Sequence, residues 1–178
     1  AMFMSVTTRT AGFNTIDLSN LSDSGTLLSL ILMLIGGSPG STAGGLKTTT
    51  IAVVVIAVFA MAKGGDDINT FKRRIVSDVV KQSAVIILIY LFAVMLSSMI
   101  ICSVEGLGMS QVLFETASAA GTVGVSKGIT NQISAISKII LMIMMYGGRI
   151  GGLSLVLVFG QRKPEAPVKR PTEQILIG

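Results

Sequence analysis

Two short apolar runs joined by a glycine-rich segment constrain this chain more than any other feature. Residues 27–35 and 48–62 are apolar, and residues 36–47 between them are mostly Gly, Ser and Thr. Neither run is long enough to cross a bilayer, since about 20 residues are needed for roughly 30 Å of hydrocarbon. Together they could do so, and the sequence therefore predicts one transmembrane helix broken in its middle by a loop. A flexible linker between two interfacial helices is the alternative interpretation.

The rest of the chain also has the composition of a membrane protein. Hydrophobic residues make up 51% and charged residues 13% of the sequence, whereas about a quarter of a soluble domain is charged. Further apolar runs cover residues 79–102, 109–120 and 136–159. Residues 79–102 are long enough for a full crossing, and residues 109–120 are too short for one. We therefore expect an all-α integral membrane fold, located in a bacterial plasma membrane.

The basic residues indicate the orientation of the chain. Most of them gather in residues 63–81 and in the tail, namely Lys63, Lys72, Arg73, Arg74, Lys81, Arg162, Lys163, Lys169 and Arg170. Basic segments that flank membrane spans usually face the cytoplasm. The sequence thus predicts a multi-pass protein with a cytoplasmic C-terminus, in which residues 109–126 dip into the membrane from outside. This distribution, without interleaved aromatic residues, argues against a nucleic-acid partner.

The order of the runs indicates an internal repeat. From residue 79 onward the chain reads as a long helix, a short half-helix with a Gly-rich loop, and a second long helix. Residues 3–13 and the broken helix match the last two parts of this unit, so the first copy is truncated. We expect three regions. Residues 1–74 end one pore repeat, residues 75–160 form the next, and residues 161–178 form the tail.

Each repeat carries one candidate loop for holding a cation. A dehydrated cation needs backbone carbonyls in place of its water, and glycine lets the backbone turn its carbonyls inward. The segment Thr122-Val123-Gly124-Val125 resembles the filter of potassium channels and follows a half-helix whose negative dipole end would face the cation. The segment Thr10-Ala11-Gly12-Phe13 holds the same place in the first copy. K⁺ is the expected permeant ion, with Na⁺ as a second candidate, and we expect no organic cofactor.

The loop that breaks the first helix is predicted to be a mobile gate. Its small residues would tolerate a water-filled cavity, and its lysine would place a positive charge near the cation path. A phosphate-binding loop is excluded by spacing, because Leu46 separates the last glycine from the lysine. Arg149 lies inside the last apolar run, and such a residue is expected to pair with carbonyls of this loop or else to reach the inner interface. The candidate gate residues are Gly36, Gly37, Gly40, Ser41, Thr42, Gly44, Gly45, Lys47 and Arg149.

Several chemistries are not expected here. The chain has no His and a single cysteine, which excludes a His general base, a Cys/His zinc site and an intrachain disulfide. A membrane enzyme would need converging acids or nucleophiles within the membrane, and we expect none in the apolar runs.

These motifs together resemble the Trk/Ktr/HKT superfamily of potassium transporters, most closely the membrane subunit of bacterial Ktr systems. The resemblance rests on residues 5–15, residues 36–50, Thr122-Val123-Gly124, Gly148-Arg149-Ile150-Gly151, residues 71–74 and residues 175–178. It implies four helix–pore-loop–helix repeats around one pore, of which this chain would hold the third, without its opening helix, and the fourth. Gly12 and Gly124 would then be filter glycines, and Arg149 would contact the intramembrane gate.

The resemblance also implies partners. Membrane subunits of this kind form homodimers, and they sit on a cytoplasmic ring of nucleotide-binding regulatory subunits. The expected function is potassium uptake through the filter, with sodium stimulation as a further expectation. Two alternatives stay open, a sodium-conducting relative of the same scaffold and a non-conducting scaffold that docks the ring. Glycine at position 12 favours potassium, because serine at such positions accompanies sodium transport in the plant branch.

Overall fold

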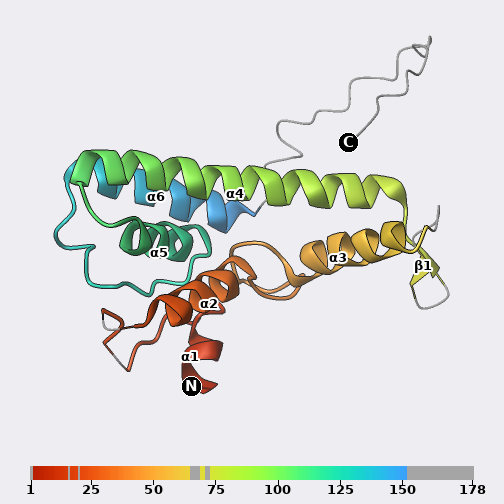
Figure 1. The fold of residues 1–178 in the computed structure, drawn as a ribbon, viewed down its shortest axis with the longest axis horizontal. Helices are drawn as coiled ribbons and strands as arrows, with labels where there is room; N and C mark the ends of the chain where they lie inside the picture. The colour runs from red at the N-terminus through yellow and green to blue at the C-terminus, as the bar shows by residue number, and fades with distance from the viewer. Residues whose placement is uncertain (1, 16, 20, 65–68, 71–72, 152–178) are drawn as a thin grey trace, which may run out of the picture.

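The computed structural model describes residues 2–15, 17–19, 21–64, 69–70 and 73–151. Its helices are α1 (Met2–Thr7), α2 (Asp23–Leu34), α3 (Thr48–Ala62), α4 (Ser77–Glu105), α5 (Met109–Ala120) and α6 (Ala135–Ile150). A short strand β1 (Asn69–Thr70) pairs antiparallel with β2 (Arg73–Arg74). The described part is therefore helical except for this one pair of strands, which lies in the predicted basic loop (Figure 1). The tail at residues 161–178 and the end of the last apolar run lie outside the described residues.

Local signals set several of these boundaries. Ser22 precedes α2 and its hydroxyl accepts a hydrogen bond from the Gly25 amide, while Ser134 precedes α6 and accepts from the Ser137 amide. Such N-cap bonds satisfy amides that the first helical turn leaves without partners. Helices α3 and α5 have the bounds that the apolar runs predict, and α4 extends its run by a few residues at each end.

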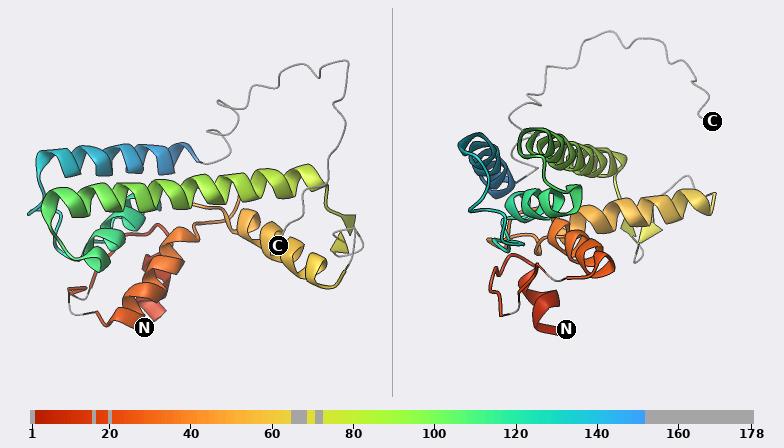
Figure 2. Two further views of the ribbon diagram at one scale, coloured as in Figure 1. Left: turned by 45° about the horizontal axis from the view of Figure 1, so that its top comes forward. Right: turned by 60° about the vertical axis from the view of Figure 1, so that its left-hand side comes forward.

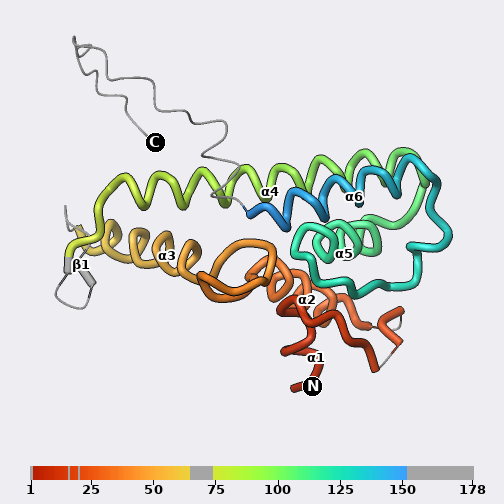
Figure 3. The backbone as a smooth tube through the Cα atoms, turned by 180° about the vertical axis from the view of Figure 1, so that it is seen from behind, coloured from red at the N-terminus to blue at the C-terminus, as the bar shows by residue number. Residues whose placement is uncertain are grey.

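Helix α5 is the element around which the others pack. It contacts α2, α4 and α6, and the views in Figures 2 and 3 show it between α2 and the pair formed by α4 and α6. Every residue from Phe114 to Ala120 is buried. One apolar cluster joins α5 to α4 and α6 through Ile101, Val112 and Leu141. A hydrogen bond of 2.6 Å between the Ser98 and Thr116 hydroxyls adds a polar contact between α4 and α5, a kind of link that is common between membrane helices.

The carboxylate of Glu105 joins the end of α4 to the start of α6, so that the two ends of the segment containing α5 lie close together. Glu105 ends α4 and accepts hydrogen bonds from the Ser134 amide, at 2.9 Å, and from the hydroxyls of Ser134 and Ser137 at the start of α6. The chain between these points forms α5 and then a loop. It therefore leaves and rejoins the helix pair at the same end, as the predicted order of long helix, half-helix, loop and long helix requires.

The lengths of the helices agree with a broken first span. In the described part of the chain, α4 is the helix that is long and apolar enough to cross a membrane, and α2 and α3 are shorter apolar helices. Residues 35–47 separate α2 from α3, at the position where the sequence predicts the break.

Two neighbouring glycines of α6 give a test of this packing. A Cβ atom on Gly148 would collide with the carbonyl oxygen of Ala120, whereas a Cβ atom on Gly147 would meet nothing within 4 Å. We expect Gly148→Ala to lower the free energy of unfolding by about 2 kcal/mol through overpacking. Gly147→Ala is the matched control, and it should be neutral or stabilising by up to about 1 kcal/mol because alanine favours a helix. Thermal unfolding of the two variants in detergent measures the difference, and equal midpoints would contradict this account of the α5–α6 contact.

Candidate functional site

The loop after α5 holds an unusual backbone conformation. Thr122 has φ of 52° and Gly124 has φ of 88°, a region that residues other than glycine rarely adopt. The side chains of Val123 and Val125 are buried and pack against Leu18, Met33 and Phe114. Gly124 is exposed, and a Cβ atom there would meet nothing within 4 Å. The loop thus anchors its valine side chains in the protein and leaves the backbone at Gly124 accessible.

The loop after α1 repeats this conformation. Thr10 has φ of 62° and Gly12 has φ of 76°, so a left-handed threonine again precedes a left-handed glycine by two residues. The pairs Thr10 and Thr122, Gly12 and Gly124, and the caps Ser22 and Ser134 share the same spacing along the chain. This agreement in backbone geometry supports the internal repeat. Ala11 and Phe13 are exposed, and the Phe13 carbonyl accepts a hydrogen bond from the Thr7 hydroxyl.

The two repeated loops also meet in space. A Cβ atom on Gly12 would collide with the carbonyl oxygen of Val123. Glycine at position 12 is therefore required for one loop to lie against the other. The sequence predicted two related loops, and the structure places them side by side.

The segment between α2 and α3 is a folded loop with closed ends. The Gly36 amide donates to the Leu46 carbonyl at 2.8 Å, and the Thr48 amide donates to the Gly37 carbonyl at 3.2 Å. Lys47 spans the interior of the loop, since its Nζ donates to the carbonyls of Ala43, at 2.5 Å, and Ser41, at 3.2 Å. Gly36, Gly44 and Gly45 are buried, while Gly40, Ser41 and Thr42 are exposed. These bonds give the segment a defined shape, unlike the flexible linker of the alternative interpretation.

This loop contacts both the Thr122 segment and α6. The Gly44 amide donates to the Thr122 hydroxyl at 3.1 Å, and a Cβ atom on Gly44 would collide with the Thr122 side chain. Arg149 donates from Nη1 to the Thr42 carbonyl. The sequence predicted an arginine contact with carbonyls of this loop, and that contact is present. The role of the loop as a gate stays a prediction.

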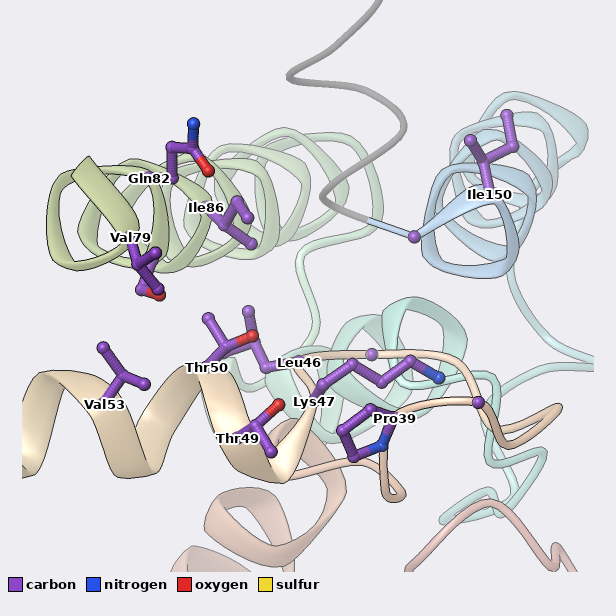
Figure 4. Close-up of a pocket in the computed structure, with 14 residues that line it drawn as sticks. Pro39, Leu46, Lys47, Thr49, Thr50, Val53, Val79, Gln82, Ile86 and Ile150 are labelled. Atoms are coloured by element: carbon purple, nitrogen blue, oxygen red, sulfur yellow. The ribbon is translucent and has the colours of Figure 1, made fainter. Parts of the chain in front are cut away.

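A cavity of about 500 Å³ lies beside the loop. It is bounded by the loop, the start of α3, the first half of α4 and the end of α6, and Figure 4 shows Lys47 and Pro39 on the loop side of it and Val79 and Ile86 of α4 on the opposite side. A second cavity of about 210 Å³ is lined by apolar residues and by Tyr90 of α4. The Tyr90 hydroxyl is buried and has no hydrogen-bond partner among the described residues.

Sequence reasoning missed two charged residues near the Thr122 loop. The expectation that no acid lies in the apolar runs is wrong, because Glu115 lies within residues 109–120 and is 6% exposed. Lys127 follows the loop and is 9% exposed, and its Nζ donates to the Thr26 hydroxyl of α2 at 2.7 Å. The sequence did hold a signal for Glu115, because it is a carboxylate within a short segment of small and apolar residues. A charged residue in such a segment is rarely buried without partners, so its presence indicates that partners exist.

Comparison with known proteins agrees with the family resemblance. A family model described as TrkH, cation transport protein, matches residues 1–169. The chain is 38% identical over 178 residues to the Ktr system potassium uptake protein D of Bacillus subtilis, with all of the chain and 40% of that protein covered. It is 38% identical over 187 residues to the potassium/sodium uptake protein NtpJ of Enterococcus hirae, with 99% of the chain and 40% of that protein covered.

A third relative is the Ktr system potassium uptake protein B of Bacillus subtilis. It is 33% identical over 176 residues, which cover 99% of the chain and 39% of that protein. The chain thus spans about two fifths of the length of these three relatives.

The bond between Gly44 and Thr122 gives a test of the site geometry. Thr122→Val keeps the shape of the side chain but removes the acceptor, whereas Thr122→Ser keeps the hydroxyl. We expect amide exchange in residues 36–47 to become about fivefold faster in the valine variant, since a hydrogen bond contributes about 1 kcal/mol. Exchange in the serine variant should stay near that of the parent protein. Hydrogen–deuterium exchange measured by mass spectrometry gives these rates. Equal rates in the parent protein and both variants would refute the contact.

Proposed function

The chain belongs to the TrkH family of cation transport proteins, and from that premise we propose that it forms part of a potassium-selective pore. Its family is one of membrane transporters and not of enzymes. The observation that carries the proposal is the pair of repeated loops, in which Thr10 and Gly12 of one loop match Thr122 and Gly124 of the other in backbone conformation. The contact between Gly12 and Val123 brings the two loops together.

The chemistry of this pair suits a dehydrated cation. Potassium loses its water in a filter only where backbone oxygens replace it. The candidate lining comprises residues 10–13 and residues 122–125, and the buried valines leave the backbone as the exposed surface of the second loop. The C-terminal end of α5 lies directly before Thr122, and the negative end of its dipole favours a cation there. Inward movement would be driven by the membrane potential, which contributes about 2.3 kcal/mol per charge per 100 mV.

Two loops cannot surround an ion, so we propose that two further repeats complete the pore. The relatives named as potassium uptake proteins are more than twice as long as the matched region, which leaves room for those repeats. The complete protein would cross the plasma membrane several times, with its C-terminus in the cytoplasm. Because some relatives are named as parts of a Ktr system, we propose that it works with other components, namely a second copy of itself and a cytoplasmic nucleotide-binding ring.

We propose that residues 36–47 gate the pore. The loop lies against Thr122 through Gly44 and is held in shape by Lys47 and Arg149, which together donate to the carbonyls of Ser41, Thr42 and Ala43. Opening would require these charge-assisted bonds to break or to move with the loop. The lysine therefore has a second role besides the repulsion that the sequence suggested, because it closes the loop on itself.

Two other functions make different predictions. Sodium conduction by the same scaffold is favoured by one relative, whose name includes both potassium and sodium. A non-conducting scaffold would have no use for two matched loops in contact. Uptake assays that compare the two cations distinguish all three functions.

The filter is tested by uptake of rubidium, a potassium substitute, into potassium-depleted liposomes that hold the full-length protein under an inside-negative potential. We expect uptake that potassium competes for and sodium does not. Gly124→Ser should lower the rubidium-to-sodium ratio by roughly tenfold, because a side chain at this positive φ disturbs the backbone. No uptake of either ion by correctly inserted protein would support the scaffold, and preferred sodium uptake would support the sodium conductor.

The gate is tested by removing the lysine that closes the loop. Lys47→Met has a side chain of similar length without the charge, and we expect it to raise rubidium uptake by about threefold or more, since the loop loses two charge-assisted bonds. Lys63→Met, at an exposed position after α3, is the matched control and should leave uptake unchanged. Equal uptake by the Lys47 variant and the parent protein would show that the loop does not limit flux.

A further inference from the structure

A buried carboxylate lies behind the Thr122 loop. Glu115 is in the middle of α5, and both of its carboxylate oxygens accept hydrogen bonds from the chain that follows the loop. Oε1 accepts from the Ser126 hydroxyl and, at 3.2 Å, from the Lys127 amide, and Oε2 accepts from the Thr130 hydroxyl at 3.1 Å. One side chain therefore holds three donors within residues 126–130 against the half-helix.

The same segment is also bound to α2. The Lys127 ammonium donates to the Thr26 hydroxyl at 2.7 Å and lies 5.5 Å from the centre of the Phe114 ring, a distance at which a cation is attracted to an aromatic face. The Lys127 amide is bound to Glu115 while its side chain is bound to α2. The chain just after Val125 is thus fixed between two helices.

These contacts act on the candidate filter, because Ser126 follows Val125 directly. Within residues 122–125 the backbone is in a strained conformation at Thr122 and an exposed one at Gly124. Such conformations persist only where the surrounding structure fixes them. Val123 and Val125 fix the loop through apolar packing, and Glu115 fixes the end at which the loop leaves the pore. The corresponding position in the first repeat is Phe3, so the repeat itself does not supply this carboxylate.

We propose that Glu115 is a positioning residue for cation selectivity, which holds the carbonyls of residues 122–125 at the spacing that favours potassium over sodium. The inference rests on the proposed function of the loop as a filter. Glu115 binds the donors of Ser126, Lys127 and Thr130 and need not touch the ion. Without this acceptor, the loop relaxes and its oxygens approach a smaller cation more closely, so that sodium is rejected less well.

The test compares two carboxylates that each accept three hydrogen bonds but lie in different parts of the structure. Glu115→Ala removes a carboxylate that accepts three hydrogen bonds behind the filter, and Glu105→Ala removes one that accepts three at the junction of α4 and α6, away from the filter loop. Full-length variants in liposomes are assayed for the ratio of rubidium to sodium uptake, and in detergent for the midpoint of thermal unfolding. We expect both to unfold earlier, but only Glu115→Ala to lower the uptake ratio, by about tenfold. Glu115→Gln should lower it less, because its carbonyl oxygen still accepts from Ser126 and Lys127.

An unchanged ratio in Glu115→Ala, or an equal loss in Glu105→Ala, would overturn the proposal. If Glu115→Ala does not insert into the membrane, Ser126→Ala combined with Thr130→Val decides instead, since it removes two donors and leaves α5 unchanged. A lower ratio in that variant supports the proposal and a parental ratio refutes it. Failure of the parent protein to select rubidium would contradict the proposed function itself, whereas a selective parent with an equally selective Glu115→Ala would contradict this inference alone.

Discussion

Close approach of glycine backbone to the end of α5 and the loop after it is the constraint on which the rest of the structure depends. Three segments touch residues 120–123 at positions where a Cβ atom would not fit, namely Gly12, Gly44 and Gly148. They belong to the first repeated loop, the candidate gate and α6. Small residues permit such contacts between membrane helices, where packing and hydrogen bonds replace the hydrophobic effect as the source of association. Both repeated loops and the loop between α2 and α3 can meet at one place for this reason.

Irregular backbone at membrane depth also needs partners for its polar groups, because lipid offers none. Residues 35–47 obtain them from their own closed ends, from Lys47, from Arg149 and from the Thr122 hydroxyl. In residues 126–130 the Lys127 amide obtains one from Glu115, which also accepts hydrogen bonds from the Ser126 and Thr130 hydroxyls. Lys47, Arg149 and Glu115 thus each bind a backbone group of these loops. That arrangement permits an exposed glycine backbone at a candidate filter without a loss of order around it.

A hydrogen bond links the candidate gate to the candidate filter, because the Gly44 amide of the gate donates to the Thr122 hydroxyl of the filter loop. A change in the position of the loop would therefore act first on the residue at which the left-handed backbone begins. Glu115 acts at the other end of the same loop. In the proposed pore, the contact between Gly44 and Thr122 would change with gating, whereas the contacts of Glu115 would stay fixed. Flux and selectivity would then be controlled at different ends of the filter loop.

The sequence by itself determined the elements and their order. The bounds of α3 and α5 follow from apolar runs that end at charged or glycine residues, and the break between α2 and α3 follows from a run of residues that favour neither helix nor lipid. The repeat was readable because a short segment, a loop with threonine two residues before glycine, and an apolar helix follow one another in the same order in both copies. The contact of Arg149 with loop carbonyls was also foreseeable, since an arginine in an apolar run needs oxygen partners. The functional roles of these residues remain predictions.

Only the tertiary structure decided which polar groups meet. Glu115 was overlooked when the apolar runs were expected to hold no acid, and its partners lie on a loop that the sequence could not place in space. Lys127 was not among the candidate residues, and its partner Thr26 belongs to the other repeat. The contact between Gly12 and Val123 likewise joins distant segments. Helix bounds depend on local composition. These contacts depend instead on how the two repeats pack against each other, which is decided by residues far apart in the sequence.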